Sequence, residues 1–497
     1  MISVVWFKRD LRLDDHSPLI KALNMDHPTL CLHIIEPDLW KEPDLSFRQY
    51  QFYKESIQDL LTQFESKGLH LVLKVGQALD VLKELHNTYG LHSIYSHQET
   101  WNNWTYQRDI VIKKWTKENA IIWDESLQFA VFRRLSTRDG WSKKWNMLMN
   151  QEPFKAPKNK TSLNLKNDPI PTDKKVGLSD DGCCYRQKGG RKEALSLLNS
   201  FFDHRGCHYT KDMSSPISAK DACSRLSPYL AFGCISMREV HHYTRNFQGK
   251  GAFQDRENQK QWRSAVRSFS GRLRWHCHFI QKLEDQPSLE FKNQHPAYDS
   301  VLYNDTKNSD SFDRWKKGET GYPFVDACMR ALTTWGWINF RMRAMLMSFV
   351  SHHLFHHWRD SAVYLATQFV DYEPGIHYSQ CQMQAGTTGI NAIRIYNPIK
   401  QGKDQDPEGV FIREWIPELR ECPKEFIHEP WHWVSERNLY PLPIVDEKEA
   451  RTAASKQLYS LRRHKDFKDE AKKIVNKHAS RKKNAPLKKR DQLQLFE

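Results

Sequence analysis

The chain has 497 residues and a formal charge of +15, so we expect two domains and a polyanionic partner. No apolar run approaches the roughly 18 residues of a membrane-spanning helix, and the N-terminus lacks the charged-then-apolar order of a signal peptide. The 10 cysteines include no CxxC pair, which argues against a disulfide framework, a zinc site or an iron–sulfur cluster. We therefore expect no metal, and reduced thiols in a cytoplasmic protein.

The first 130 residues alternate strand and helix patterns. Five apolar runs predict buried parallel strands; they span 2–7, 29–35, 69–75, 93–96 and 120–123. Between them, three segments carry apolar residues at the three- and four-residue spacings of amphipathic helices; they span 47–66, 78–89 and 104–118. The alternation predicts a doubly wound α/β domain over 1–130. No GxGxxG follows the first strand, which disfavours a Rossmann phosphate loop.

The rest of the chain changes character twice. Residues 131–190 are polar and rich in Lys, Asn and Pro, which predicts an interdomain linker. From residue 191 the pattern is helical, with 323–349 a clear example, so 191–447 is predicted as a large helical domain. The remaining 448–497 is predicted as one charged helix to residue 478 and a disordered basic tail from 479.

The positive charge gathers near the C-terminus. Between Arg462 and Arg490 there are 13 Lys and Arg residues against 3 Asp and Glu, a net charge of +10. Each cation near a phosphate releases condensed counterions, so this segment favours nonspecific attraction to DNA. The alternative is a solvated tail whose charge only keeps the protein soluble.

Four motifs follow one another in a fixed order from residue 223 onward. They are CSRLSPYLAFG at 223–233, RLRWHCHF at 272–279, KGETGYPFVDACMRAL at 317–332 and the stretch 337–398. Together they resemble the photolyase/cryptochrome family, which binds flavin adenine dinucleotide (FAD) in a helical domain and uses blue light to move an electron. In that family the α/β domain can hold an antenna chromophore, a folate or a deazaflavin. Glu99 lies where such a site would fall, but these residues assign no antenna.

Residues for the FAD phosphates follow from the resemblance. Ser224 and Ser227, with Pro228 following, are typical of a helix start, where Ser side chains and backbone N–H groups suit a pyrophosphate. An ordinary capped core helix is the alternative. Tyr209 matches a family Tyr that lines the phosphates, and Cys223 stands where a Thr is usual. The other cofactor-binding residues implied are Arg225, Leu226, Phe269, Arg272, His276, Phe340, Arg343, Asp371, Glu373 and His377.

Near the flavin ring, Arg343 and Asp371 match a family ion pair that would tune the ring's potential and proton affinity. Glu373 stands where the family uses a second Asp. By the resemblance, His377 occupies the position that faces flavin N5, where most photolyases have an Asn. A histidine there can donate a proton or carry charge near neutral pH; a satisfied core or surface His is the alternative.

Light-driven flavin reduction in this family usually passes through a chain of tryptophans. Trp358 matches the middle member, whereas the proximal position falls on Cys381 and a nearby second Trp on Met383. The outer member falls on Tyr303 or Asn304. Cysteine is a poor replacement carrier, so the resemblance implies a broken chain. Other routes stay open, including Trp335, Trp337 and Tyr378.

The resemblance also implies DNA contacts. Trp275 and Arg341 match family positions that stack on a flipped-out dimer and touch phosphate, and Lys211 is a further expected contact. A cyclobutane-dimer enzyme would carry an Asn and a Met where this chain has Phe340 and Ala344. A (6-4) enzyme would carry two histidines at the same two places, so neither standard set is present.

The residue three positions before Trp275 differs as well. A cyclobutane-dimer enzyme would place a Glu there, and this chain has Arg272. With His276 and His278, Arg272 would offer cationic donors to a thymine carbonyl or its radical anion.

We therefore expect a light-driven flavoenzyme that repairs pyrimidine dimers by electron transfer from excited reduced FAD, with Trp358, His377 and Arg272 as catalytic residues. A cryptochrome-type photoreceptor is the alternative, favoured by the broken tryptophan chain, the changed N5 neighbour and the missing Glu. A flavin-binding nucleic-acid protein without photochemistry is a third reading. The expected partner is damaged DNA, and we expect a cytoplasmic monomer, nucleoid-associated in a bacterium.

Overall fold

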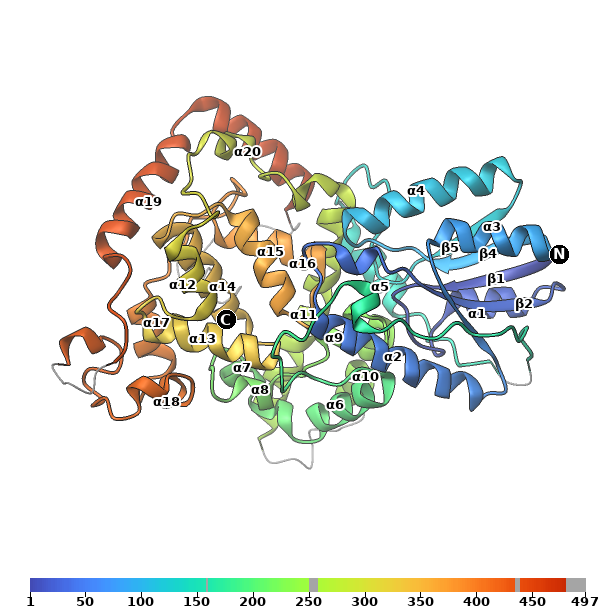
Figure 1. Cartoon of the computed structure of the whole chain (residues 1–497), viewed down its shortest axis with the longest axis horizontal. Helices are drawn as coiled ribbons and strands as arrows, with labels where there is room; N and C mark the ends of the chain where they lie inside the picture. The colour runs from blue at the N-terminus through green and yellow to red at the C-terminus, as the bar shows by residue number, and fades with distance from the viewer. Residues whose placement is uncertain (158–159, 250–257, 434–438, 480–497) are drawn as a thin grey trace.

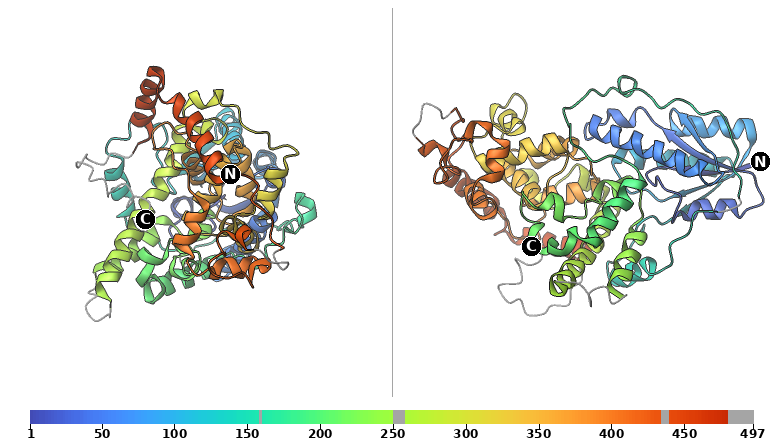
Figure 2. Two further views of the ribbon diagram at one scale, coloured as in Figure 1. Left: turned by 90° about the vertical axis from the view of Figure 1, so that its left-hand side faces the viewer. Right: turned by 90° about the horizontal axis from the view of Figure 1, so that it is seen from below.

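The computed structural model describes residues 1–157, 160–249, 258–433 and 439–479. It consists of an α/β domain followed by a larger helical part (Figure 1), which confirms the predicted fold class. The two parts lie at opposite ends of the long axis, blue and orange in the right-hand view of Figure 2. Within the described ranges, no helix is both long and apolar enough to cross a membrane. The tail predicted from 479 falls almost entirely outside those ranges.

A five-stranded parallel sheet forms the centre of the α/β domain, in the order β3-β2-β1-β4-β5. The strands are β1 Ile2–Phe7, β2 Thr29–Ile35, β3 Leu71–Val75, β4 Leu91–His97 and β5 Ile122–Ser126. All five predicted strands are confirmed: β1 and β2 have the predicted ends, and the ends of the other three differ by up to three residues. Every residue of β1 and β2 is buried, as expected for strands covered on both faces.

Helices cover both faces of this sheet. They are α1 Ser17–Leu23, α2 Phe47–Glu65, α3 Ala78–Tyr89 and α4 Asn103–Glu118, with the 3₁₀ turn η1 Leu39–Lys41. Val4 packs into the cluster with α3 and α4, and its neighbour Val5 packs into the cluster with α1 and α2. The cluster that contains Val5 continues into the helical part, so one apolar core joins the α/β domain to the helical part. The three predicted helices are confirmed; the seven-residue α1 had too short a pattern to detect.

The segment 131–190, predicted as a linker, contains α5 Trp141–Met149 and the turn η2 Asp173–Val176. It connects the two domains and also packs against both. Trp145 of α5 is fully buried, and the Leu163 N–H donates to the carbonyl of Thr29 at 2.8 Å, beside the sheet. The polar composition of this segment therefore did not indicate that some of its residues pack against the two domains.

The helical part is built from α6 to α18. These are α6 Arg191–Asp203, α7 Tyr209–Asp212, α8 Ala219–Ala222, α9 Ser227–Ala231, α10 Met237–Gly249, α11 Gln259–Asp285, α12 Asp310–Lys317, α13 Pro323–Trp335, α14 Phe340–Ser348, α15 Trp358–Gln368, α16 Pro374–Gln384, α17 Pro398–Gln405 and α18 Val410–Trp415. Short turns connect them: η3 Arg205–His208, η4 Pro287–Glu290, η5 Pro296–Ser300, the π-helical η6 Phe349–His353, η7 Pro417–Leu419 and η8 Pro430–His432.

Two glycines set the packing that matters most for the site. Gly336 has φ +66° and ends α13, so the run 323–349 is two helices and a π-turn rather than one helix. Gly375 opens α16 against α11, where an added Cβ would lie 2.6 Å from the Cα of Ile280. Only a residue without a side chain permits this close approach of the two helices.

The charged segment 448–478 forms two helices, α19 Glu447–Leu461 and α20 Lys465–His478, so the prediction of one helix is wrong. They run along the outer edge of the helical part (Figure 1). Arg462 ends α19 and donates to the Tyr298 hydroxyl and the Asn391 carbonyl. Phe467 then stacks on His295 with ring centroids 3.8 Å apart. This burial of Phe467 is a tertiary contact that helix propensity does not report.

Candidate functional site

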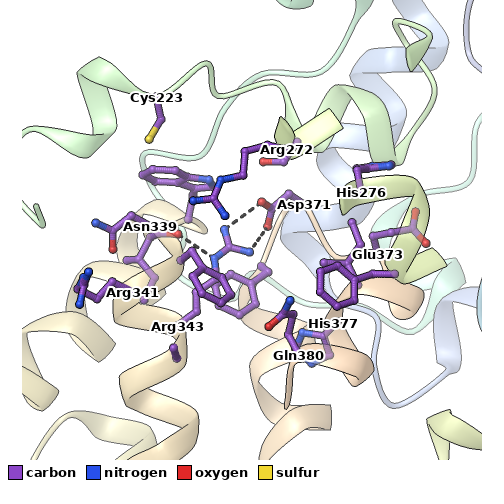
Figure 3. A pocket seen from close by; sticks show the side chains of 18 of the residues that line it. Cys223, Arg272, His276, Asn339, Arg341, Arg343, Asp371, Glu373, His377 and Gln380 are labelled. Carbon is purple, nitrogen blue, oxygen red and sulfur yellow. Dashed lines mark hydrogen bonds and ion pairs between the residues drawn. The ribbon is translucent and has the colours of Figure 1, made fainter. Parts of the chain in front are cut away.

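The helical part encloses a cavity of about 350 Å³, bounded by α7, α11, α14 and α16 and by the loops before α9, α14 and α16 (Figure 3). Most of the sequence-predicted residues line it: Tyr209, Cys223, Ser227, Arg272, Trp275, His276, Phe340, Arg341, Arg343, Asp371, Glu373 and His377. Segments separated by more than 160 residues of sequence thus converge on one space, as the resemblance implies.

Other predicted residues lie outside the lining: Lys211, Ser224, Arg225, Leu226, Phe269 and Trp358. Two of them support the wall. The Arg225 guanidinium lies 4.0 Å from the ring centre of Trp337, which lines the cavity, and Phe269 contacts the ring of Tyr209. Lys211 is exposed on α7, Ser224 lies in the loop before α9, and Leu226 is buried. Trp358 is fully buried at the start of α15.

Helix α11 supplies one wall of the cavity. Arg272, Trp275, His276 and Phe279 follow one another at helical spacing and share a face. Trp275 remains partly exposed and stacks on Phe279 with ring centroids 5.6 Å apart. This side of the cavity therefore combines a cation with an aromatic surface.

Arg343 and Asp371 form the expected ion pair. Arg343 Nη1 and Nη2 donate to the two carboxylate oxygens of Asp371 at 3.0 and 2.9 Å, and Nε donates to the Ile338 carbonyl at 2.8 Å (Figure 3). The guanidinium also lies 4.0 Å from the ring centre of Phe369. These contacts fix the guanidinium in one plane, as two-point carboxylate binding requires.

Glu373, at the start of α16, is the second acid of the site. Burial raises its pKa to about 7, although Arg9 lies 3.4 Å away and opposes the shift. Its Oε1 has no hydrogen-bond partner within the described part of the chain. Buried polar atoms are rarely left unpaired, so this oxygen is ready to accept a hydrogen bond from a bound group.

His377 faces the cavity from α16. Its Nε2–H donates to the Ala362 carbonyl at 2.8 Å, and Cys381 Sγ lies 3.6 Å from the same nitrogen. Burial lowers its pKa to about 4, with the Arg343 charge adding to the effect. The imidazole is therefore neutral near pH 7.

The two histidines beside Arg272 are neutral as well. Burial lowers the pKa of His276 to about 4 and takes that of His278 well below its usual value. His278 packs against Trp275 and does not line the cavity. The prediction that both serve as cationic donors is therefore wrong, and Arg272 is left as the cation of that set.

Several lining residues were missed by sequence reasoning, among them Asn339, Tyr372, Ile376, Gln380 and Gln384. The four-residue spacing of 376, 380 and 384 was a detectable signal, because these positions share one face of α16. Asn339 had a local signal too: its side chain caps α14 by accepting from the Met342 N–H at 3.2 Å. Tyr372 lies in a loop and had none.

Glu99, the residue expected beside an antenna chromophore, is surrounded by charged side chains of the protein. Glu99 Oε2 accepts from Arg108 Nη2 at 2.5 Å, and Arg108 also pairs with Glu36 and Asp109. Lys8 contacts Asp109 at 3.0 Å. The cavity beside Glu99 and Arg108 is only about 40 Å³. A larger groove of about 680 Å³ runs between α4, β5 and α20, with Glu99 at its edge.

The fold and the cavity define a two-domain protein with a parallel α/β domain and a helical, cofactor-binding domain. The family model for the FAD binding domain of DNA photolyase matches residues 269–460, and the DNA photolyase model matches residues 3–131. The chain belongs to the photolyase/cryptochrome family, which confirms the resemblance, and FAD is its cofactor.

Known relatives match over nearly the whole chain. The deoxyribodipyrimidine photo-lyase of Escherichia coli K12 is 29% identical over 478 residues, covering 90% of this chain and 96% of the relative. A cryptochrome DASH of Gloeobacter violaceus is 25% identical, covering 92% and 95%. The crystal structure of a class III photolyase from Agrobacterium tumefaciens superposes with a TM-score of 0.78 at 27% identity, covering 93% of this chain and 98% of that one.

Proposed function

We propose that this protein is a light-driven flavoenzyme that repairs ultraviolet-induced pyrimidine dimers in DNA. One observation carries the proposal: the cavity that holds the Arg343–Asp371 pair is also lined by Trp275 and Arg341, both partly exposed. A base extruded from a duplex needs an aromatic surface and a cation for its phosphate at the edge of the catalytic pocket.

The cavity residues suit FAD. Tyr209 and Ser227 would hold the phosphates, with Cys223 beside them as a neutral thiol, since burial raises its pKa to about 12. The Arg343–Asp371 pair would lie against the flavin ring. When bound, FAD supplies a light-absorbing one-electron donor.

Two acceptor groups complete the cradle. The unpaired Oε1 of Glu373 would accept from a hydroxyl of the cofactor. His377, whose Nε2–H is committed to the Ala362 carbonyl, would offer a neutral ring without a proton to give.

Arg272 replaces the acid of a standard dimer-reading set. Its guanidinium would stabilise the negative charge that an electron places on a pyrimidine carbonyl, since a fixed cation in a pocket shielded from water acts more strongly than one in solution. The neutral His276 beside it would donate or accept a hydrogen bond without adding charge. The lesion would therefore be recognised mainly by charge and stacking.

DNA binding would extend beyond the cavity. Arg341 would contact a phosphate next to the flipped base, Trp275 would stack on the base, and the exposed Lys211 of α7 would touch the flanking strand. We further propose that the protein acts as a monomer and stays close to DNA in the cell, with the basic C-terminal residues adding nonspecific affinity.

The second candidate is a photoreceptor without repair activity. It is favoured by Cys381 in the cavity wall, where the family's electron chain usually begins with a Trp, and by the 25% identity to a cryptochrome DASH over 92% of this chain. It predicts light-driven flavin chemistry without loss of any DNA lesion.

A repair assay separates the two. Chemically reduced holoenzyme is illuminated with oligonucleotides that carry a cyclobutane dimer or a (6-4) photoproduct, single- and double-stranded, with dark controls. Loss of one lesion only in the light is the expected result. Arg272→Ala should slow repair at least about tenfold, whereas Arg274→Ala, exposed on the same helix and outside the cavity, should not. Intact flavin with neither lesion lost would overturn the proposal.

A further inference from the structure

A buried carboxylate, Asp44, lies between two tyrosines. The Tyr372 hydroxyl donates a short hydrogen bond to Asp44 Oδ2, and the Tyr378 hydroxyl donates to the same oxygen at 3.2 Å. Asp44 comes from the loop before α2, whereas Tyr372 and Tyr378 come from the loop before α16 and from α16 itself. Asp44 is 3% exposed, and its Oδ1 has no partner among the described residues. The proposed repair chemistry assigns no role to this cluster.

The two tyrosines also connect the cavity to Trp358. Tyr372 lines the cavity, and its ring centroid lies 6.2 Å from that of Tyr378. The ring of Tyr378 lies 6.3 Å from that of Trp358 in a T-shaped contact. Trp358 Nε1 donates to Asn293 Oδ1 at 2.8 Å, so the indole is held in place. Three redox-capable side chains are therefore in consecutive ring contact, beginning at the cavity.

Tyr372 has a second aromatic neighbour at the same distance, Trp101, but electron transfer from it is electrostatically unfavourable. The Trp101 ring lies 6.2 Å from Tyr372, but the Arg9 guanidinium lies 3.9 Å from the centre of that indole. A radical cation on Trp101 would face this positive charge at close range and in a buried setting, where repulsion is weakly screened. The positive charge of Arg9 therefore disfavours electron transfer from Trp101 and favours the route through Tyr378.

Resting on the proposed function, which places FAD in the cavity, we propose that Tyr372, Tyr378 and Trp358 form a proton-coupled electron relay with Asp44 as the proton acceptor. Tyr372 gives one electron to the light-excited, oxidised flavin, and its O–H bond breaks as the proton moves to Asp44 Oδ2. The products on the protein are a neutral tyrosyl radical and a carboxylic acid. Asp44 is within hydrogen-bond reach of that proton, as a general base must be.

The same proton then serves the second tyrosine. An electron passes from Tyr378 to the Tyr372 radical, Asp44 returns the proton to Tyr372, and Tyr378 gives its own proton to Asp44. Next, Trp358 reduces the Tyr378 radical, which regains its proton from Asp44, and the electron deficit rests on Trp358 as a radical cation. An external thiol returns Trp358 to its resting state: it gives one electron to the radical cation and its proton to water, and two of the resulting thiyl radicals combine to a disulfide. Burial raises the pKa of Asp44, which strengthens it as a proton acceptor.

The contacts of Trp358 supply an outward path. His357 lies 5.6 Å from its ring, and the partly exposed Tyr303 lies 5.1 Å from His357. Tyr303 was one of the two residues expected at the outer position of the family's chain.

The test measures light-driven reduction of oxidised holoenzyme with dithiothreitol as the donor. Tyr378→Phe keeps the ring and removes the transferable proton, and we expect the initial rate to fall at least about tenfold. The initial rate of Asp44→Asn should fall by a similar factor. Trp101→Phe, which removes the other branch at the same distance from Tyr372, is the matched control and should keep the wild-type rate.

A second readout detects the radical on the protein rather than the reduced flavin. In wild-type protein frozen under illumination, electron paramagnetic resonance should show a radical whose signal narrows with ring-deuterated tryptophan, as expected for Trp358. Tyr378→Phe should instead leave a tyrosyl radical on Tyr372, whose signal narrows with ring-deuterated tyrosine. Reduction in D₂O should be slower for wild type and lose that isotope effect in Asp44→Asn. Wild-type rates in both Tyr378→Phe and Asp44→Asn, or loss of rate in Trp101→Phe alone, would overturn the relay.

The relay and the proposed function fail separately. Tyr378→Phe should repair dimers at the wild-type rate when its flavin is reduced chemically beforehand, because the relay is then bypassed. If wild type repairs dimers after chemical reduction but is not reduced by light and thiol, the relay is wrong and the repair function stands. If wild type is reduced by light through a tyrosyl radical but repairs neither lesion, the repair function is wrong and the relay stands.

Discussion

Arg9 Nη2 lies 3.4 Å from Glu373 Oε2, so residues 364 positions apart in sequence form an ion pair between the two domains. Arg9 follows β1, and Glu373 lines the cavity at the start of α16. The α/β domain thus contributes directly to the charge of the cavity wall.

Removing Arg9 should therefore disturb both stability and the cofactor. Arg9→Met removes the cation beside the buried Glu373 carboxylate, which should cost about 3 kcal/mol of unfolding free energy at about pH 9, where Glu373 is ionised in wild type. Urea unfolding of the holoprotein, monitored by circular dichroism, measures this. In a Glu373→Gln background the same substitution should cost much less, because no charge is left unpaired. Equal costs in the two backgrounds would show that Arg9 acts through packing alone.

Glu290 should make stability depend on pH. Its Oε2 accepts from the Asn103 N–H at 2.8 Å, and burial, with Asp44 nearby, raises its pKa to about 8. The folded state thus binds the proton more tightly than the unfolded chain. The stabilisation is complete below pH 4.5 and is lost as pH rises through about 8, a change of up to about 5 kcal/mol at about 1.4 kcal/mol per pKa unit.

Glu290→Gln keeps the acceptor and removes the titration. Its unfolding free energy relative to wild type should rise between pH 4.5 and 8, measured by denaturant titration at several pH values. The exposed Glu118→Gln on α4 is the control and should run parallel to wild type. A parallel profile for Glu290→Gln would contradict the raised pKa.

Trp275 and Arg341 should be separable as DNA contacts. Trp275→Ala should weaken binding to lesion-bearing DNA by about 1–3 kcal/mol, the contribution of one stacked base, with little effect on undamaged DNA. Arg341→Ala should weaken binding to both and reduce the slope of log K against log salt by about 1. Fluorescence anisotropy at several salt concentrations measures both. An Arg341→Ala variant with an unchanged slope would place that side chain away from phosphate.

The shape of the Arg343 guanidinium, and not only its charge, should be needed for FAD binding. Arg343→Lys keeps the charge but cannot make the two parallel bonds to Asp371, so FAD should dissociate about tenfold more readily, which is about 1.4 kcal/mol. Equilibrium dialysis against free FAD measures the affinity. Full retention of FAD by Arg343→Lys would show that charge alone suffices.

The sequence predicted elements whose signals are local. The five strands were visible as apolar runs, and 47–66 as an amphipathic helix, because burial on two faces or one leaves a periodic pattern. The ion pair of Arg343 and Asp371 was predictable only through the resemblance, since nothing in either residue's neighbours shows that they meet.

What remained hidden is tertiary. Beyond the break at Arg462, Phe467 contacts His295, and the neutrality of His377 comes from its burial in the cavity wall. Asp44 was not singled out because its partners, Tyr372 and Tyr378, lie more than 320 residues away. Such contacts have no signature in a local window of sequence.

The close approach at Gly375 has a consequence for how the cavity behaves when its contents change charge. Because α16 rests on the backbone of α11 with no room for even a methyl group, the two walls that carry Arg272 and His377 cannot slide past each other. The dipoles and charges that line the cavity therefore keep their positions on the timescale in which an electron would leave a flavin bound there and return. Little energy is dissipated in reorganising the surroundings, and more of each absorbed photon remains for breaking bonds.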